Sequence, residues 1–188
     1  MSLIDESDPY NWLKVTHLLV EGEVKIKRSA KVMVAMSRAS YVVTVDWLRS
    51  CIENKTHIPP THRVDVKVPK NEESNKTISA DSLERASVMR KTGKGVLSGC
   101  AISLCKQVAG KRAPTLQELE CMVTAAGADW MGECIPEKQS RGKRTIVITS
   151  DPCSKRQEKA LKIRGDGVLT KTTSWLFDTL MFQRLDLK

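Results

Sequence analysis

The chain has 188 residues and is 40% hydrophobic and 28% charged, an ordinary globular composition with room for one domain or two small ones. No segment approaches the run of about 18 apolar residues that a membrane-spanning helix needs. The acidic first residues lack the basic-then-apolar layout of a signal peptide, so neither secretion nor a membrane partner is expected. The net charge of +9 instead favours polyanionic partners such as nucleic acid or phosphopeptides.

The six cysteines are irregularly spaced and include no C-x-x-C pair, so neither a disulfide framework nor a zinc site is expected. Cys51, Cys105 and Cys121 lie in apolar contexts, where a thiol behaves as a small hydrophobic side chain. We therefore expect free, mostly buried thiols in a reducing compartment, and no metal or cofactor.

The first part of the chain alternates between strand and helix patterns. An apolar run at 15–20 predicts a buried strand, and a β-branched run at 41–45 predicts a second one. Between them, Ser29 is placed to cap a helix. After the second strand, Asp46 is expected to cap a helix that ends near Asn54. This order favours a parallel sheet covered by helices.

The middle of the chain breaks this pattern. Residues 59–79 contain a Pro-Pro pair and a long polar run, which predict a linker with one short extended piece. Asp81 and Glu84 then resemble a capping box, so a short helix is expected through Arg90.

The second part repeats the strand and helix order. Thr115 is placed to cap a helix, and Gly127 to end it. A basic helix and an apolar terminal helix follow. The expected strands are 96–105, 144–150 and 167–170, and the expected helices are 115–127, 154–165 and 172–183.

One local pattern occurs twice, about 128 residues apart: a strand ending in Thr, followed by a helix with an early Trp. The two copies are VVTVDWLRSCI at 42–52 and VLTKTTSWLFDTL at 168–180. The interval is too long for a solenoid repeat, so we expect two related α/β domains. Trp47 and Trp175 are expected to anchor the two cores.

This repeated ending resembles the BRCT family. The matching pieces are THLLV, RSAKVMVAM and YVVTVDWLRSCI, and later GVLSGCAI, RTIVITS and SWLFDTLM. Their order is similar to that of a tandem BRCT pair, such as the C-terminal module of DNA-damage checkpoint mediators. The resemblance implies an α/β fold of two BRCT-like domains, each a small parallel sheet flanked by helices, joined by a partly helical linker.

The resemblance also implies a division of the chain. We expect a partial first BRCT domain at 1–58, a linker with a short helix at 59–94, and a second BRCT domain at 95–188. The segment 1–14 is too short to supply the strand, helix and strand that begin a BRCT domain. The first domain is therefore expected to lack part of its sheet.

The resemblance further implies a binding site. In the resembling group, an Arg-Ser/Thr-x-Lys motif at the start of a helix binds a phosphorylated histone tail, and the same spacing appears here at 28–31. Lys31 would contact the phosphate, and Arg28 the peptide main chain or its terminal carboxylate. Asp151 and Pro152 match a position that borders the peptide groove. Independently, a helix N-terminus prefers negative charge, so an anion bound there would explain the crowded cations.

The family's phosphate pocket also contains a Ser/Thr-Gly pair at the end of the first strand. No such pair is found in the first part of the chain, whereas Ser98-Gly99 is expected to occupy that position in the second part. Each charge-assisted hydrogen bond contributes about 1.5–3 kcal/mol, so phosphate affinity is expected to be weaker than is usual in the family.

The function implied is a non-enzymatic, nuclear adaptor of the DNA damage response that binds a phosphoserine in a phosphorylated protein or histone tail. One alternative is a DNA-binding module that uses the basic stretch 138–164, which has nine Lys/Arg against two acidic residues. Another alternative is a phosphate-independent scaffold. The cations at 25–31 could then only face water or form a nuclear-localisation patch. The sequence contains no P-loop, H-E-x-x-H or nucleophile elbow, so no enzymatic activity is expected.

Overall fold

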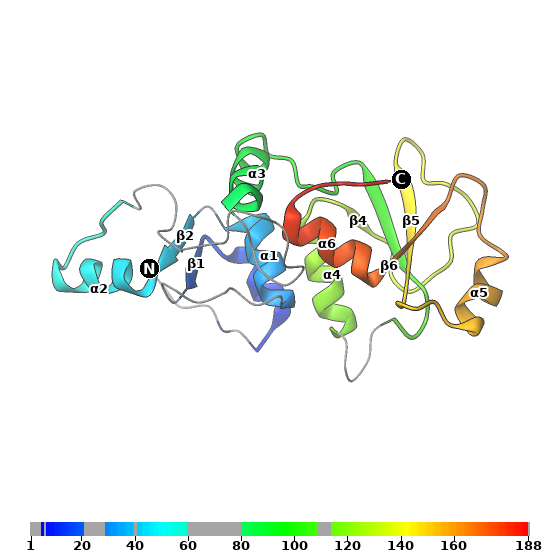
Figure 1. The fold of residues 1–188 in the computed structure, drawn as a ribbon, viewed down its shortest axis with the longest axis horizontal. Helices are drawn as coiled ribbons and strands as arrows, with labels where there is room; N and C mark the ends of the chain where they lie inside the picture. Colours follow the sequence, from blue (N-terminus) through cyan, green and yellow to red (C-terminus); the bar gives the residue numbers. More distant parts are fainter. Residues whose placement is uncertain are drawn as a thin grey trace.

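The computed structural model describes residues 5, 7–20, 29–39, 41–59, 80–108 and 114–187, which form two parallel sheets with helices around them (Figure 1). In the first sheet, β1 (His17–Val20) pairs with β2 (Tyr41–Thr44). The second sheet has the order β4-β3-β5-β6 and is entirely parallel. Its strands are β3 (Cys100–Leu104), β4 (Asp129–Trp130), β5 (Arg144–Thr149) and β6 (Leu169–Thr172). The predicted α/β fold class is confirmed.

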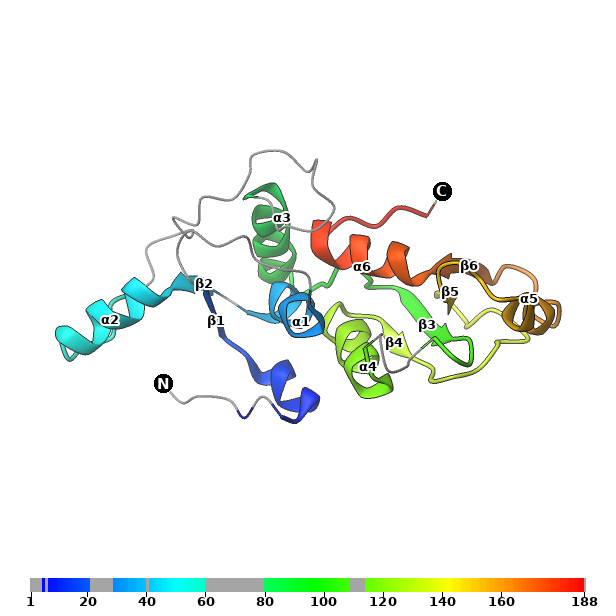
Figure 2. The same cartoon turned by 60° about the horizontal axis from the view of Figure 1, so that its bottom comes forward.

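The helices separate the two sheets and extend beyond them. Figures 1 and 2 show α2 at one end of the molecule and α5 at the other, with α1, α4 and α6 between the sheets. Among the described helices, none combines the length and the apolar character needed to cross a bilayer. Their bounds are η1 (a 3-10 helix, Pro9–Lys14), α1 (Ala30–Arg38), α2 (Val45–Glu53), α3 (Ala80–Lys91), α4 (Leu116–Ala125), α5 (Lys155–Leu161) and α6 (Thr173–Phe182).

Helix α1 connects the two parts of the molecule. Its residues Met33, Val34, Ala35 and Met36 are all at most 3% exposed, because the helix packs against η1, α3, α4 and α6 as well as β1. Burial of a methionine or valine side chain contributes about 1.5–3 kcal/mol. The same hydrophobic cluster contains residues of β3, β5, α4 and α6, so the two parts share one core.

Helix α3 holds α1 and α6 by their C-terminal ends. Arg85 Nε donates to the carbonyl oxygen of Phe182, and Arg90 Nη1 donates to that of Met36, both at 2.7 Å. These carbonyls lie in the last turns of their helices, where the macrodipole favours a cation. Burial lowers the pKa of the Arg90 guanidinium, and its bond to Met36 offsets the cost of removing that charge from water.

The two copies of the repeated pattern begin their helices in the same way. Thr44 Oγ1 accepts a hydrogen bond from the Trp47 amide at 3.2 Å, and Thr172 Oγ1 accepts one from the Trp175 amide at 3.3 Å. The last Thr of each strand is thus the cap of the next helix. The prediction that Asp46 caps α2 was wrong, because this residue lies in the first turn of the helix.

The two tryptophans are half-buried, so their expected role as core anchors was wrong for Trp47 and holds only in part for Trp175. No residue of α2 is buried, and the Trp47 ring stacks on His17 near the molecular surface. The Trp175 ring packs against the shared core with part of its surface, and Lys171 Nζ lies 5.7 Å from its centroid.

Several element boundaries differ from the predictions. Residues 96–99 form a turn, and the strand expected at 96–105 begins only at Cys100. Gly99 ends this turn with a φ of +82°, which is incompatible with a strand and favours glycine. Asp81 lies inside α3 and not at its cap, and the expected linker at 59–79 falls almost wholly outside the described residues. Neither η1 nor β4 was predicted.

All six cysteines are free thiols, as expected. Cys100, Cys105 and Cys121 are buried, whereas Cys51, which lies in an apolar stretch of the sequence, is only half-buried on helix α2. Burial raises the pKa of both Cys105 and Cys121 to about 11, so these two thiols stay protonated at neutral pH and are poor nucleophiles.

Candidate functional site

The start of α1 has the geometry of an anion-binding helix end. Ser29 is extended, with φ −143° and ψ 158°, and its Oγ accepts from the Val32 amide at 3.3 Å. Lys31 is the second residue of the helix, and the first turn contains no acidic residue. A cation at this position opposes the macrodipole, so it does not serve the stability of the helix. A bound anion would interact favourably with both the Lys31 ammonium and the N-terminus of the helix.

Lys31 is placed over an aromatic ring. Its Nζ lies 5.9 Å from the centroid of Trp12, which is 8% exposed and belongs to η1. Lys31 itself is half-buried. A cation–π contact orients the ammonium and does not remove its positive charge, so the group still attracts a phosphate.

The short helix η1 forms one wall of this site. Asp8 accepts from the Tyr10 amide at 3.0 Å and so caps the helix, with Pro9 at its first position. The Tyr10 hydroxyl donates to Glu120 Oε2 in α4 at 3.0 Å, and this hydrogen bond raises the pKa of Tyr10. Helix η1 packs on both α1 and α4, so Lys31 lies where the two parts of the chain meet.

Trp12 is the site residue that the sequence left undefined. Helix η1 places the Trp12 ring against the Lys31 ammonium, a contact between residues of two different helices. The local signal for η1 is Asp8 followed by Pro9, a cap residue followed by a residue favoured at the first helical position.

In the part of the chain that the structure describes, none of the other predicted site residues lies beside Lys31. Arg28 lies outside them. Asp151 and Pro152 are exposed in the connection from β5 to α5, where Ser150 Oγ donates to the Pro152 carbonyl at 3.0 Å. Figures 1 and 2 both show this connection on the side of the second sheet away from α1. The roles of Arg28, Asp151 and Pro152 stay predictions.

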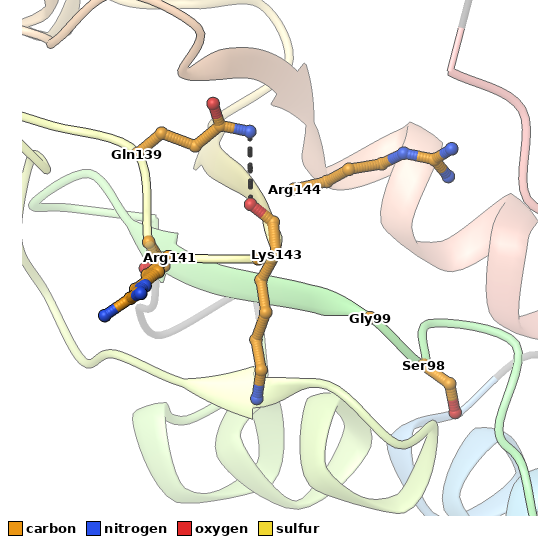
Figure 3. Close-up of a pocket in the computed structure, with 8 residues that line it drawn as sticks. Ser98, Gly99, Gln139, Arg141, Lys143 and Arg144 are labelled. Carbon is orange, nitrogen blue, oxygen red and sulfur yellow. Dashed lines mark hydrogen bonds between the residues drawn. The ribbon is translucent and has the colours of Figure 1, made fainter.

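Ser98-Gly99 does not occupy the strand-end position expected for it. The pair precedes β3, at the opposite end of the strand, because Gly95 to Ser98 close a turn in which the Ser98 amide donates to the Gly95 carbonyl at 3.0 Å. Gly95 allows this turn to press against α4, since a Cβ there would lie 1.9 Å from the Ala126 carbonyl oxygen. Ser98 and Gly99 instead line an open pocket together with residues 139–144 (Figure 3).

No protein-family model matches the chain, and no curated protein matches it in sequence. Among solved structures, it is similar to the crystal structure of the BRCT5–BRCT6 domains of S. pombe Brc1, with a TM-score of 0.65 and 19% sequence identity. The similarity covers 99% of this chain and 91% of that chain. The chain has the fold of a tandem BRCT module.

Helix α1 lies where the two units of this fold meet. In this chain α1 packs against strand β1 of the first sheet and against helices α4 and α6 of the second unit, so one helix holds the two units together. The start of the same helix presents Lys31 beside η1 and α4. A ligand that binds there would contact the place where the two units join.

Proposed function

We propose that this chain is a protein-interaction module of the DNA damage response and that it binds a phosphoserine peptide at the start of α1. The fold shared with the BRCT5–BRCT6 domains of S. pombe Brc1 supports the general part of this proposal. The position of Lys31 in the first turn of α1, over Trp12, is the observation that supports the phosphate site.

The physical reason lies in the charges at this helix start. A phosphoserine carries a charge of about −1.5 to −2 at pH 7, which complements both a lysine ammonium and a helix N-terminus. Charge-assisted hydrogen bonds of this kind are about twice as strong as neutral ones. The ligand would neutralise the unfavourable contact between the Lys31 charge and the helix dipole.

The remaining parts of the proposal are based on the resemblance of the sequence to the BRCT family. Arg28 would contact the peptide main chain or its terminal carboxylate with its planar guanidinium, and Asp151 and Pro152 would border the ligand further along. We further propose a nuclear, non-enzymatic adaptor whose partner is a phosphorylated protein or histone tail, with the domains divided at 1–58, 59–94 and 95–188.

Fluorescence polarisation with a labelled phosphoserine peptide and its unphosphorylated twin tests the site. We expect the wild-type chain to prefer the phosphopeptide, and Lys31→Met to weaken that binding by at least about tenfold, corresponding to about 1.4 kcal/mol. Arg28→Gln is expected to weaken mainly the peptides that end shortly after the phosphoserine.

The matched control is Arg156→Met. Arg156 is exposed and, like Lys31, is the second residue of a helix capped by a serine, in this case Ser154 of α5. The control removes the same charge from the equivalent helix position in the other unit, so it should leave phosphopeptide binding within about twofold. Equal binding by wild type and Lys31→Met would refute the site. Equal affinity for both peptides would favour a phosphate-independent scaffold.

A further inference from the structure

An open pocket lies at the edge of the second sheet where β3 and β5 begin, and the proposed phosphopeptide site uses none of its residues. Ser98 and Gly99 line one side, and residues 139–144 line the other (Figure 3). A tight turn, in which the Lys143 amide donates to the Ser140 carbonyl at 3.1 Å, places Arg141, Lys143 and Arg144 around this pocket.

Other connections bring more charge to the same edge. The Gly165 amide donates to the Pro136 carbonyl at 2.9 Å, so the connection from α5 to β6 lies beside the segment before β5. Lys143 forms an ion pair with Asp129, which takes up part of the positive charge. The connections 92–99, 131–143 and 162–168, together with the first residues of β4 and β5, contain seven cations and four carboxylates, a net charge of +3: Lys94, Lys138, Arg141, Lys143, Arg144, Lys162 and Arg164 against Asp129, Glu133, Glu137 and Asp166.

The tertiary structure divides the basic stretch 138–164 into two groups. Strand β5 (Arg144–Thr149) carries the chain from this edge to the opposite one, a distance of about 20 Å at roughly 3.3 Å per residue. Lys155 and Arg156 begin α5 on that far side. Of the cations in this stretch, Arg141, Lys143 and Arg144 line the pocket, and Lys162 and Arg164 lie in the connection that returns toward this edge.

The directions of the side chains indicate an extended ligand. In Figure 3, Arg141 and Arg144 point away from each other and Lys143 points in a third direction, so the three cations do not converge on a single phosphate. Side chains that point in different directions can contact different phosphates along one extended backbone. Ser98 Oγ accepts from the Gly95 amide at 2.8 Å and points away from these cations in Figure 3, so the charged side chains would make the phosphate contacts.

The composition of the pocket distinguishes a duplex from a single strand. Single-stranded nucleic acid is usually bound by aromatic side chains that stack on its bases, and none of the described residues that line this pocket is aromatic. Contacts from Arg, Lys and Ser to phosphates position a duplex without reading its sequence. We infer that this edge of the second sheet binds the phosphate backbone of a nucleic-acid duplex, independently of base sequence.

Fluorescence anisotropy with a labelled DNA duplex of about 20 base pairs tests this inference. The double variant Arg141→Ala with Arg144→Ala removes two exposed arginines beside the pocket. At about 100 mM salt we expect at least about a tenfold loss of affinity, and a plot of log affinity against log salt that is shallower by about 1.8, because each lost phosphate contact removes about 0.9.

The control double variant is Arg156→Ala with Lys159→Ala, which removes the same charge from exposed positions of α5. It should lower affinity by less than about threefold, since a remote charge acts only through the screened field. Equal losses in the two double variants, or no duplex binding by the wild type in low salt, would overturn the inference. So would a loss of phosphopeptide binding, instead of duplex binding, in the pocket variant. Thermal melting checks that all variants fold.

Lys31→Met separates this inference from the proposed function. The variant should keep its duplex affinity because Lys31 lies at the start of α1, among η1 and α4, and is not part of the pocket. If duplex binding depended on Lys31 as strongly as on Arg141 and Arg144, the pocket would not be the duplex site.

Discussion

Helices α2 and α6 have equivalent places in the repeated pattern and share their local contacts. In each, Trp is the third helical residue, and its indole Nε1 donates to a main-chain carbonyl eleven residues later. Trp47 donates to Ile58 at 3.1 Å, and Trp175 to Asp186 at 2.5 Å. The sequence pattern thus fixes how each helix begins and how the chain returns after it.

The surroundings of these two helices differ. Helix α6 packs against α1, α3, β5 and β6, and four of its residues are buried. Helix α2 packs mainly against β2, and none of its residues is buried. Equal local signals therefore lead to unequal burial, because burial depends on which other elements are near.

The largest expected difference is between Leu180→Ala and Ile52→Ala, which change the eighth residue of each helix. Leu180 is 0% exposed and Ile52 is 66% exposed. We expect Leu180→Ala to lower the free energy of unfolding by about 2–5 kcal/mol, since it leaves a cavity in the shared core. Ile52→Ala should cost less than about 0.5 kcal/mol. Urea denaturation measures both, and similar costs would contradict the difference in packing.

Removing the two helix caps tests the feature that the helices share. Thr44→Ala and Thr172→Ala each delete one hydroxyl that accepts from the amide of the third helical residue. Both should cost about 1 kcal/mol, because a cap acts locally. Thr44→Ser and Thr172→Ser keep the acceptor and serve as controls. A cost confined to Thr172 in the same denaturation assay would show that capping depends on tertiary packing here.

His17 is the titratable group that distinguishes the first sheet. Its ring stacks on Tyr41 and Trp47, with centroids 5.0 and 5.6 Å away, and His57 approaches edge-on at 6.3 Å. Within the described part of the chain, its buried Nε2 has no hydrogen-bond partner. Burial first, and the charge of His57 second, lower the pKa of His17 below its ordinary value of 6.5.

The smallest expected effect is the pH dependence that follows from this lowered pKa. Because the unfolded chain binds the proton more readily, the stabilisation is fully present above the ordinary pKa and is lost as pH falls through the folded value. The melting temperature should therefore drop between about pH 7.5 and pH 5, and His17→Phe, which keeps a ring for stacking, should reduce that drop. An unchanged drop in the variant would assign the dependence to other groups.

The order of strands and helices was largely predictable because it depends on residues close together in the chain. The caps at Ser29, Thr115 and Ser154 and the strand at 144–149 follow from local patterns. Local patterns are ambiguous where two signals compete. Thr44 and Asp46 are both suitable cap residues, and the structure uses Thr44. Val96 and Leu97 favour a strand, whereas Gly99 requires a turn.

The candidate site was predictable only in part. The spacing of Ser29 and Lys31 indicated a cation at a capped helix start, and the structure places Lys31 there. Trp12 beneath it, and the division of the basic stretch 138–164 by β5, required knowledge of which elements lie side by side. Contacts between residues far apart in the chain leave no periodic trace in the sequence.

The sequence by itself determined most of the strand–helix order and the helix caps at Ser29 and Thr115, because each depends on residues close together in the chain. The tertiary structure alone decided that α1 is buried between two units while α2 remains at the surface, and that Arg141, Lys143 and Arg144 border a pocket with Ser98 and Gly99. Burial and electrostatic fields are summed over neighbours in space, and the fold supplies those neighbours.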